Sequence, residues 1–239
     1  MEECLENRIL PVFKNIEQEA EQVSDEEYKK LNQYANENSD ESEIAEHAYF
    51  TRVEYFSRLE AVRQSIINMF AMAWYHLFQQ QLLDFLRNEI ISFDERENYT
   101  RNDISKIHER LKQVGIDIKS ISSWDKIDEL RIISNTIKHA EGTSACELKK
   151  LRPDLFEMPP FRNNPEAKIN STKLEVYRPL LGEDLYLTLD DFKQYIKKLI
   201  IENKKEGNYI LSSGDSVPSD ARIENLNEIS DLIEKYGKY

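Results

Sequence analysis

Residues 58–86 of the chain are RLEAVRQSIINMFAMAWYHLFQQQLLDFL, and this stretch decides the fold class. Its apolar residues recur at intervals of three and four, which places their side chains along one broad face of a helix. From Ile66 to Phe78 the residues are apolar almost all round, as expected for a helix with neighbours on several sides. Asn68 and His76 interrupt the run, which is also shorter than the roughly 20 residues that a membrane span needs. We therefore predict a central core helix in an all-α protein.

Weaker helical patterns flank this core. Further helices are predicted over residues 5–37, 102–114, 124–140, 188–205 and 219–237, and a small β-hairpin is predicted near 173–189. Thr188 is expected to cap the helix that follows it, and Ser144 with Glu147 to form a capping box. The resulting division is an acidic N-terminal helical extension (1–44), a helical core (45–152) and a C-terminal part (153–239) with the hairpin and two helices.

The composition excludes several classes of function. Only six glycines occur among 239 residues, with no G-x-G-x-x-G and no G-x-x-x-x-G-K, so the common phosphate-binding loops are missing. Cys4 and Cys146 form no C-x-x-C motif and have no histidine at ligand spacing, so we expect no metal site, no cofactor and no disulfide framework. The N-terminus has acidic residues where a signal peptide needs basic and apolar ones, which favours the cytoplasm.

The charge is unevenly distributed. The chain carries 45 acidic and 32 basic side chains, for a net charge of −13. Residues 1–50 hold 14 acidic and 4 basic side chains, a net −10, whereas residues 111–152 hold 6 and 8, a net +2. So acidic a chain repels phosphate and should not bind long nucleic-acid duplexes. Contact with a short or single-stranded RNA at this local basic patch stays open. The alternative is that the net +2 of residues 111–152 is a chance fluctuation of composition.

The predicted helix over residues 124–140 is the most informative segment. Ile127, Leu130, Ile133, Ile137 and Ala140 fall within an arc of about 140°, while Arg131, Asn135 and His139 share the opposite side. Steps of four residues put neighbours of this polar stripe in contact range. A guanidinium, a carboxamide and an imidazole in a row suit phosphate binding and proton transfer. The alternative is an ordinary solvated face, with His139 favoured at a helix C-terminus by the helix dipole.

The segment ELRIISNTIKHAEG (129–142), preceded by a long apolar helix and followed by SACEL, resembles the catalytic-helix region of the HEPN superfamily. The resemblance covers residues 45–152 and implies an all-α fold related to prokaryotic toxins and antiviral defence proteins. Active members are metal-independent endoribonucleases whose motif helices meet across a dimer. Their motif is an arginine, four to six residues, and a histidine, often with a polar residue after the arginine.

Residue by residue, the resemblance assigns proton transfer to His139, phosphate or imidazole orientation to Asn135, and a supporting substrate-binding charge to Lys138. The arginine place beside Asn135 is occupied by Ser134, and Arg131 lies a whole turn too early. Along an ideal helix Arg131 is about 12 Å from His139, so the two should meet only across a symmetric pair of helices. Arg131 would then stabilise the developing charge.

Two functions follow from these residues. The first is a HEPN-type endoribonuclease of a toxin or antiviral defence system, active as a homodimer formed through the central and motif helices and controlled by a regulatory protein partner or by its own tails. The second is a catalytically inactive HEPN-derived interaction or regulatory protein, favoured by the displaced arginine and the acidic balance. Other polar residues carry no motif: His47 and His108 are expected at the surface without partners, and Asp94, Glu95 and Glu97 as a solvated cluster.

Overall fold

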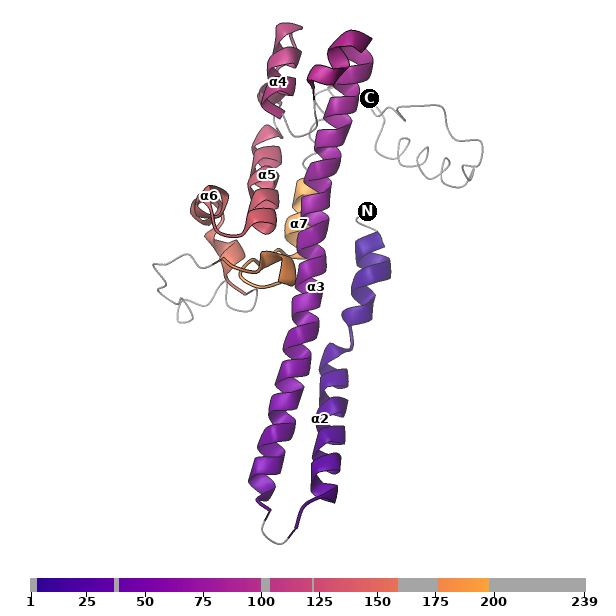
Figure 1. The fold of residues 1–239 in the computed structure, drawn as a ribbon, viewed down its shortest axis with the longest axis vertical. Helices are drawn as coiled ribbons and strands as arrows, with labels where there is room; N and C mark the ends of the chain where they lie inside the picture. The colour runs from indigo at the N-terminus through magenta and orange to yellow at the C-terminus, as the bar shows by residue number, and fades with distance from the viewer. Residues whose placement is uncertain (1–3, 37–38, 100–103, 122, 159–175, 198–239) are drawn as a thin grey trace, which may run out of the picture. The chain divides into compact units, whose positions relative to one another are not determined.

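The computed structural model describes residues 4–36, 39–99, 104–121, 123–158 and 176–197 (Figure 1). Every regular element within these ranges is helical, and none of the described residues lies in a β-strand. The all-α prediction is therefore confirmed. The HEPN-like part of that prediction, the three-part division of the chain and the homodimer remain predictions. The helix expected over 219–237 lies outside the described residues.

The chain divides into two compact units. The first comprises residues 1–76 and 131–191, and the second comprises residues 77–130 together with the chain from residue 192 onward. The helices α3 (Glu41–Phe85), α5 (Trp124–His139) and α7 (Leu189–Lys197) each contribute to both units. Each unit is described separately below. Within the described residues, no helix combines the length and the apolar character that crossing a membrane requires.

In the first unit, an N-terminal helical segment packs along α3 (Figure 1). It consists of one π-helical turn, η1 (Leu5–Ile9), a 3₁₀ turn, η2 (Leu10–Phe13), and α2 (Ile16–Gln33). The Ser24 hydroxyl donates a hydrogen bond to the Ala48 carbonyl (2.9 Å), and the Tyr55 hydroxyl donates one to Glu19 (3.3 Å). The predicted break between the N-terminal and central helices is confirmed, but α3 begins at Glu41, well before the predicted apolar stretch.

The C-terminal half of α5 continues into a short helix, α6 (Thr143–Leu151), and a 3₁₀ turn, η6 (Pro153–Phe156). The predicted bounds of α5 are confirmed to within one residue at its C-terminus. The capping box predicted for α6 is wrong. The helix begins at Thr143 and its N-cap is Gly142, so Ser144 already lies inside the first turn and not at the cap position.

Residues 176–188, which we call the strap, replace the predicted hairpin. The strap contains a 3₁₀ turn, η8 (Pro179–Leu181), and irregular backbone without strand pairing. Residues 173–175 of the predicted hairpin lie outside the described residues. Its carbonyl groups instead accept hydrogen bonds from side chains of α3: Gln64 binds Leu187, Ser65 binds Leu180, and Asn68 binds both Pro179 and Leu185. The hairpin prediction is wrong because side chains of a helix, not a second strand, satisfy this backbone.

The second unit has its own core. Besides parts of α3, α5 and α7 it contains a π-helical turn η3 (Leu86–Ile90), α4 (Ile104–Gln113) and the 3₁₀ turns η4 (Phe93–Asn98) and η5 (Ile118–Ser120). Its buried core residues are Leu83, Leu86, Ile91, Ile107, Leu111 and Ile118. As predicted, α4 stops before Gly115, whose φ of 89° and hydrogen bond to Lys112 belong to a Schellman motif.

Candidate functional site

The C-terminal half of α5 carries the residues singled out from the sequence. The helix starts after Ser123, whose carbonyl accepts hydrogen bonds from the amides of Lys126 (3.0 Å) and Ile127 (3.2 Å). It ends at Ala140, which adopts a left-handed conformation with φ of 57° while its amide donates to the Thr136 carbonyl (2.9 Å). Glycine usually occupies such a position, since a side chain there costs roughly 1–2 kcal/mol.

The buried side of α5 is wider than its sequence pattern indicates. Ile127, Leu130, Ile133 and Ile137 are at most 5% exposed, as predicted. Ile132, Ser134 and Thr136 are also buried, at 1% exposed or less. The Thr136 hydroxyl is satisfied inside the helix, where it donates to the Ile132 carbonyl (2.9 Å). At 100° per residue, the buried positions span about 220° of the circumference. Only a narrow polar strip of α5 remains accessible.

The predicted site residues lie on this strip at different depths. Arg131 and Asn135 are half-buried, whereas Lys138 and His139 are exposed in the last turn. Two turns of helix separate Arg131 from His139, so one chain does not bring a guanidinium to the imidazole. The grouping of these side chains into a site stays a prediction.

The burial of Ser134 is a feature that the sequence analysis did not predict. It occupies the arginine place beside Asn135, and it is 1% exposed. Its hydroxyl oxygen has no hydrogen-bond partner among the described residues. Around α5 it lies between Leu130 and Ile127, on the buried side of the helix. A side chain at position 134 therefore faces packed residues and not the strip that carries His139.

Two other polar groups from the sequence also have structural partners. His108 was expected at the surface without a partner, and that is wrong: it is half-buried and its Nε2 lies 3.0 Å from Asp117. This hydrogen bond, with a second from the Lys119 amide, lowers the pKa of Asp117. Glu95 forms a capping box with Ser92 and an ion pair with Arg110, and the Ser92 hydrogen bonds lower the pKa of Glu95.

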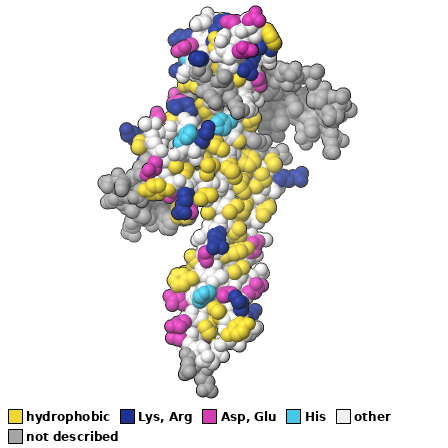
Figure 2. Space-filling model, viewed as in Figure 1, with side chains coloured by type: hydrophobic (Ala, Val, Ile, Leu, Met, Phe, Trp, Pro, Cys, Tyr) yellow, Lys and Arg dark blue, Asp and Glu magenta, His cyan; other side chains and the backbone are white. Residues whose placement is uncertain are grey.

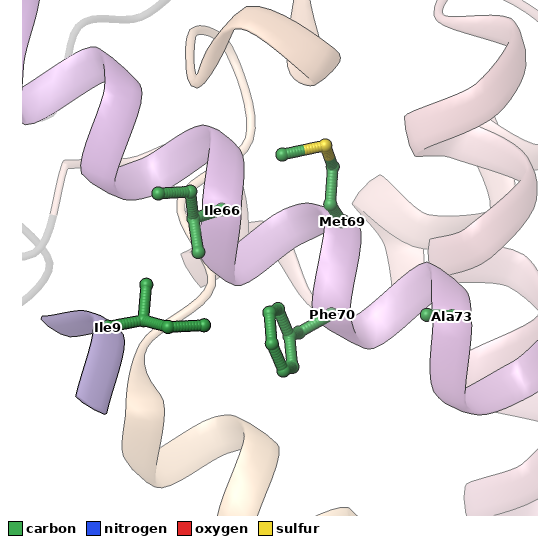
Figure 3. Close-up of a pocket in the computed structure, with 5 residues that line it drawn as sticks. All are labelled: Ile9, Ile66, Met69, Phe70 and Ala73. Carbon is green, nitrogen blue, oxygen red and sulfur yellow. The ribbon is translucent and has the colours of Figure 1, made fainter. Parts of the chain in front are cut away.

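Apolar side chains reach the surface of α3 on two faces of the first unit. Hydrophobic and acidic side chains both appear on the face drawn in Figure 2. One open pocket of about 390 Å³ is lined only by apolar residues (Figure 3): Ile9, Ile66, Met69, Phe70 and Ala73. Nearer the start of α3, Tyr49, Phe50, Val53 and Phe56 are 40–59% exposed. Both surfaces consist of aliphatic and aromatic side chains.

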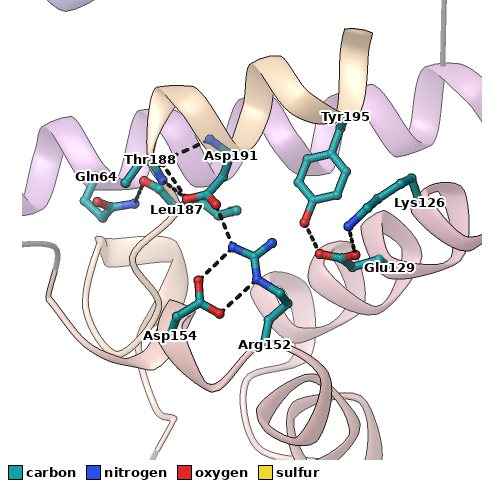
Figure 4. Close-up of polar contacts among 9 residues, drawn as sticks. All are labelled: Gln64, Lys126, Glu129, Arg152, Asp154, Leu187, Thr188, Asp191 and Tyr195. Carbon is teal, nitrogen blue, oxygen red and sulfur yellow. Dashed lines mark hydrogen bonds and ion pairs between the residues drawn. The ribbon is translucent and has the colours of Figure 1, made fainter. Parts of the chain in front are cut away.

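A partly buried ionic cluster fixes the end of the strap to the start of α7 (Figure 4). The Arg152 guanidinium donates two hydrogen bonds to Asp154 (2.9 and 2.7 Å) and one to Asp191 (2.6 Å). Asp191 also accepts from the amide and hydroxyl of Thr188, while its own amide donates to the Thr188 hydroxyl. Burial opposes ionisation of Asp191, but the Thr188 and Arg152 hydrogen bonds outweigh it and lower its pKa. These contacts tie the end of the strap and the start of α7 to Arg152, which indicates a structural role.

The second unit contains one further polar group of this kind (Figure 4). The Tyr195 hydroxyl and the Lys126 ammonium both bind the Glu129 carboxylate, each at 2.5 Å. Thr188 was correctly predicted to cap its helix, but nothing in the sequence pairs Arg152 with Asp191 or Glu129 with Tyr195. No group of three or more potential metal ligands occurs among the described residues, and Cys4 and Cys146 are free and exposed.

Comparison of the chain with protein-family models, with curated proteins and with solved structures gave no match.

Proposed function

We infer that the protein is a HEPN-derived interaction or regulatory protein that lacks nuclease activity. One observation carries this proposal: Ser134, which stands where the resemblance requires the motif arginine, is 1% exposed and lies on the buried side of α5. A cation at that place would have to be buried without a partner, which is costly. The sequence change and the local packing therefore agree with each other.

The chemistry of RNA cleavage supports the same conclusion. Attack of a 2′-hydroxyl on its own phosphate needs a proton-transfer group and a cation that stabilises the developing charge. Within one chain, Asn135 is the group one turn from His139, and a carboxamide carries no charge. Arg131 is half-buried and two turns away. The exposed apolar surfaces of α3, by contrast, suit protein binding.

A metal-independent endoribonuclease is the second candidate, because His139 and Lys138 are exposed at the end of α5. In that case His139 transfers the proton, Asn135 orients the phosphate, and Arg131 of a second subunit stabilises the charge across an antiparallel pair of helices. The products would be a 2′,3′-cyclic phosphate and a 5′-hydroxyl. This candidate requires a homodimer, whereas the first does not.

Incubation of the purified protein with total RNA in EDTA separates the two candidates. We expect no cleavage by the wild-type protein beyond that of His139→Ala, with His47→Ala as a matched control because His47 is also an exposed helical histidine. Cleavage that His139→Ala abolishes and His47→Ala retains would overturn the proposal and establish the nuclease. Cyclic phosphate ends on the products would then assign the 2′-hydroxyl mechanism.

A further inference from the structure

The exposed apolar residues near the start of α3 form a second surface, distinct from the motif helix. Their exposed fractions are 58% for Tyr49, 59% for Phe50, 42% for Val53 and 40% for Phe56. At 100° per residue the four side chains fall within an arc of about 120°. The rings of Tyr49 and Phe50 contact each other edge to face, with centroids 5.9 Å apart. We call these four residues the aromatic patch.

The aromatic patch is not the face that α2 covers. Four residues of α3 bond to α2: Ala48 accepts from Ser24, Tyr55 donates to Glu19, Glu41 accepts from Tyr28, and His47 pairs with Glu27. Around the helix these four positions lie more than 100° from the centre of the patch. Ala48 is 3% exposed, whereas Tyr49, the next residue, is 58% exposed. Three aromatic side chains grouped at the surface within two helical turns are characteristic of an interface.

The charges around the patch indicate what kind of partner it fits. Glu43 and Glu46, which precede the patch on α3, are both exposed. Three arginines lie along residues 41–63: Arg52, within the patch segment, is half-buried, and Arg58 and Arg63 pair with Glu54 and Glu60. The same stretch holds five glutamates, so its net charge is −2. Residues 1–50 carry a net charge of −10. The rim of the patch is therefore acidic, and it is complemented by a basic surface.

The same charges disfavour the other classes of occupant. A nucleic acid or an anionic membrane would bring phosphates toward an acidic rim and be repelled. A second copy of this chain, itself at −13, would bring acidic residues against acidic residues. We propose that the aromatic patch binds a basic amphipathic helix of a partner protein, with the apolar face of that helix on Tyr49, Phe50, Val53 and Phe56. This inference deepens the proposed function, on which it rests, by naming the partner's chemistry.

A labelled peptide of leucine and lysine tests the proposal on the full chain. The peptide has its leucines on one helical face and is about 20 residues long, enough to form a helix. We expect binding by fluorescence anisotropy that weakens with salt, and an affinity at least roughly tenfold lower for Phe50→Ser and for Val53→Ser. Phe93→Ser is the matched control, because Phe93 is 80% exposed but lies in η4. Circular dichroism and the urea midpoint establish that each variant is folded.

Several outcomes would overturn the proposal. Equal binding by the wild-type and Phe50→Ser proteins would show that the peptide is attracted by charge alone. Equal binding of a leucine–glutamate peptide of the same pattern would remove the electrostatic argument. A dimer in sedimentation velocity that Phe50→Ser dissociates would assign the patch to a second copy. None of these outcomes depends on RNA cleavage, so the docking surface and the absence of nuclease activity can fail separately.

Discussion

Two faces of one stretch of α3, residues 61–73, behave differently. One face binds the strap: Gln64, Ser65 and Asn68 donate side-chain hydrogen bonds to four strap carbonyls, and Gly182 lies directly on the backbone of Ala61. The other face is the apolar pocket lined by Ile66, Met69, Phe70 and Ala73. The strap face contains the polar residues and is covered, while the purely apolar face is open. The spacing of apolar residues thus shows which face of a helix can be buried. The polar side chains of Gln64, Ser65 and Asn68 determine that the strap is the segment that packs there.

Substitution of Gly182 should have the largest effect on this arrangement. A Cβ atom at this position would lie 1.9 Å from the Ala61 carbonyl oxygen, which is backbone and cannot move aside, and the φ of Gly182 is 80°. We expect Gly182→Ala to lower the free energy of unfolding by about 3 kcal/mol or more, from overpacking and left-handed strain together. Urea unfolding measures this change.

Gly115→Ala is the matched control for that substitution. Gly115 also has a positive φ, 89°, but nothing lies within 4 Å of a Cβ placed there. Its substitution should cost only the left-handed strain, roughly 1–2 kcal/mol. If both variants lose the same stability, the close approach of the strap to α3 does not exist in solution.

Asn68→Ala should have the next largest effect. Asn68 is fully buried, and its amide donates to the carbonyls of Pro179 (2.8 Å) and Leu185 (3.0 Å). Its removal leaves two buried acceptors unsatisfied, which should cost about 2–3 kcal/mol in urea unfolding. Ser65→Ala removes one bond, to Leu180, at a more exposed position and should cost about 1 kcal/mol. A smaller loss for Asn68→Ala than for Ser65→Ala would contradict the proposed anchoring of the strap.

The ionic cluster at the end of the strap predicts a pH dependence. Because the pKa of Asp191 is lowered on folding, its stabilising contribution is complete above the unfolded value of about 3.8 and is lost as the pH falls through the folded pKa. Asp191→Asn should cost about 1–2 kcal/mol at neutral pH and remove part of the stability loss below about pH 4. Urea midpoints of both proteins across pH 3–7 measure the effect, and parallel profiles would rule it out.

The sequence predicts the helices well, and the contacts between distant residues poorly. The period of three to four residues locates the apolar core of α3 and nearly all of α5, because both depend on local spacing. The strap was predicted as a hairpin because Leu185 and Leu187 alternate with polar residues, while its real partner, Asn68, is 117 positions away from Leu185. The burial of Ser134 and the pairing of Arg152 with Asp191 depend in the same way on packing between distant segments, which local periodicity does not encode.

Met69→Ser, on the open face, should have the smallest effect. Met69 is 41% exposed and lines the apolar pocket, whereas Asn68 beside it in the chain is fully buried under the strap. Replacement of a side chain that is already in contact with water changes the free energy of unfolding by no more than about 0.5–1 kcal/mol. Urea unfolding of Met69→Ser beside Asn68→Ala tests the difference between the two faces on adjacent residues. A loss for Met69→Ser as large as that for Asn68→Ala would mean that the pocket face is covered in solution. The two faces of α3 would then differ in what covers them, and not in whether they are covered.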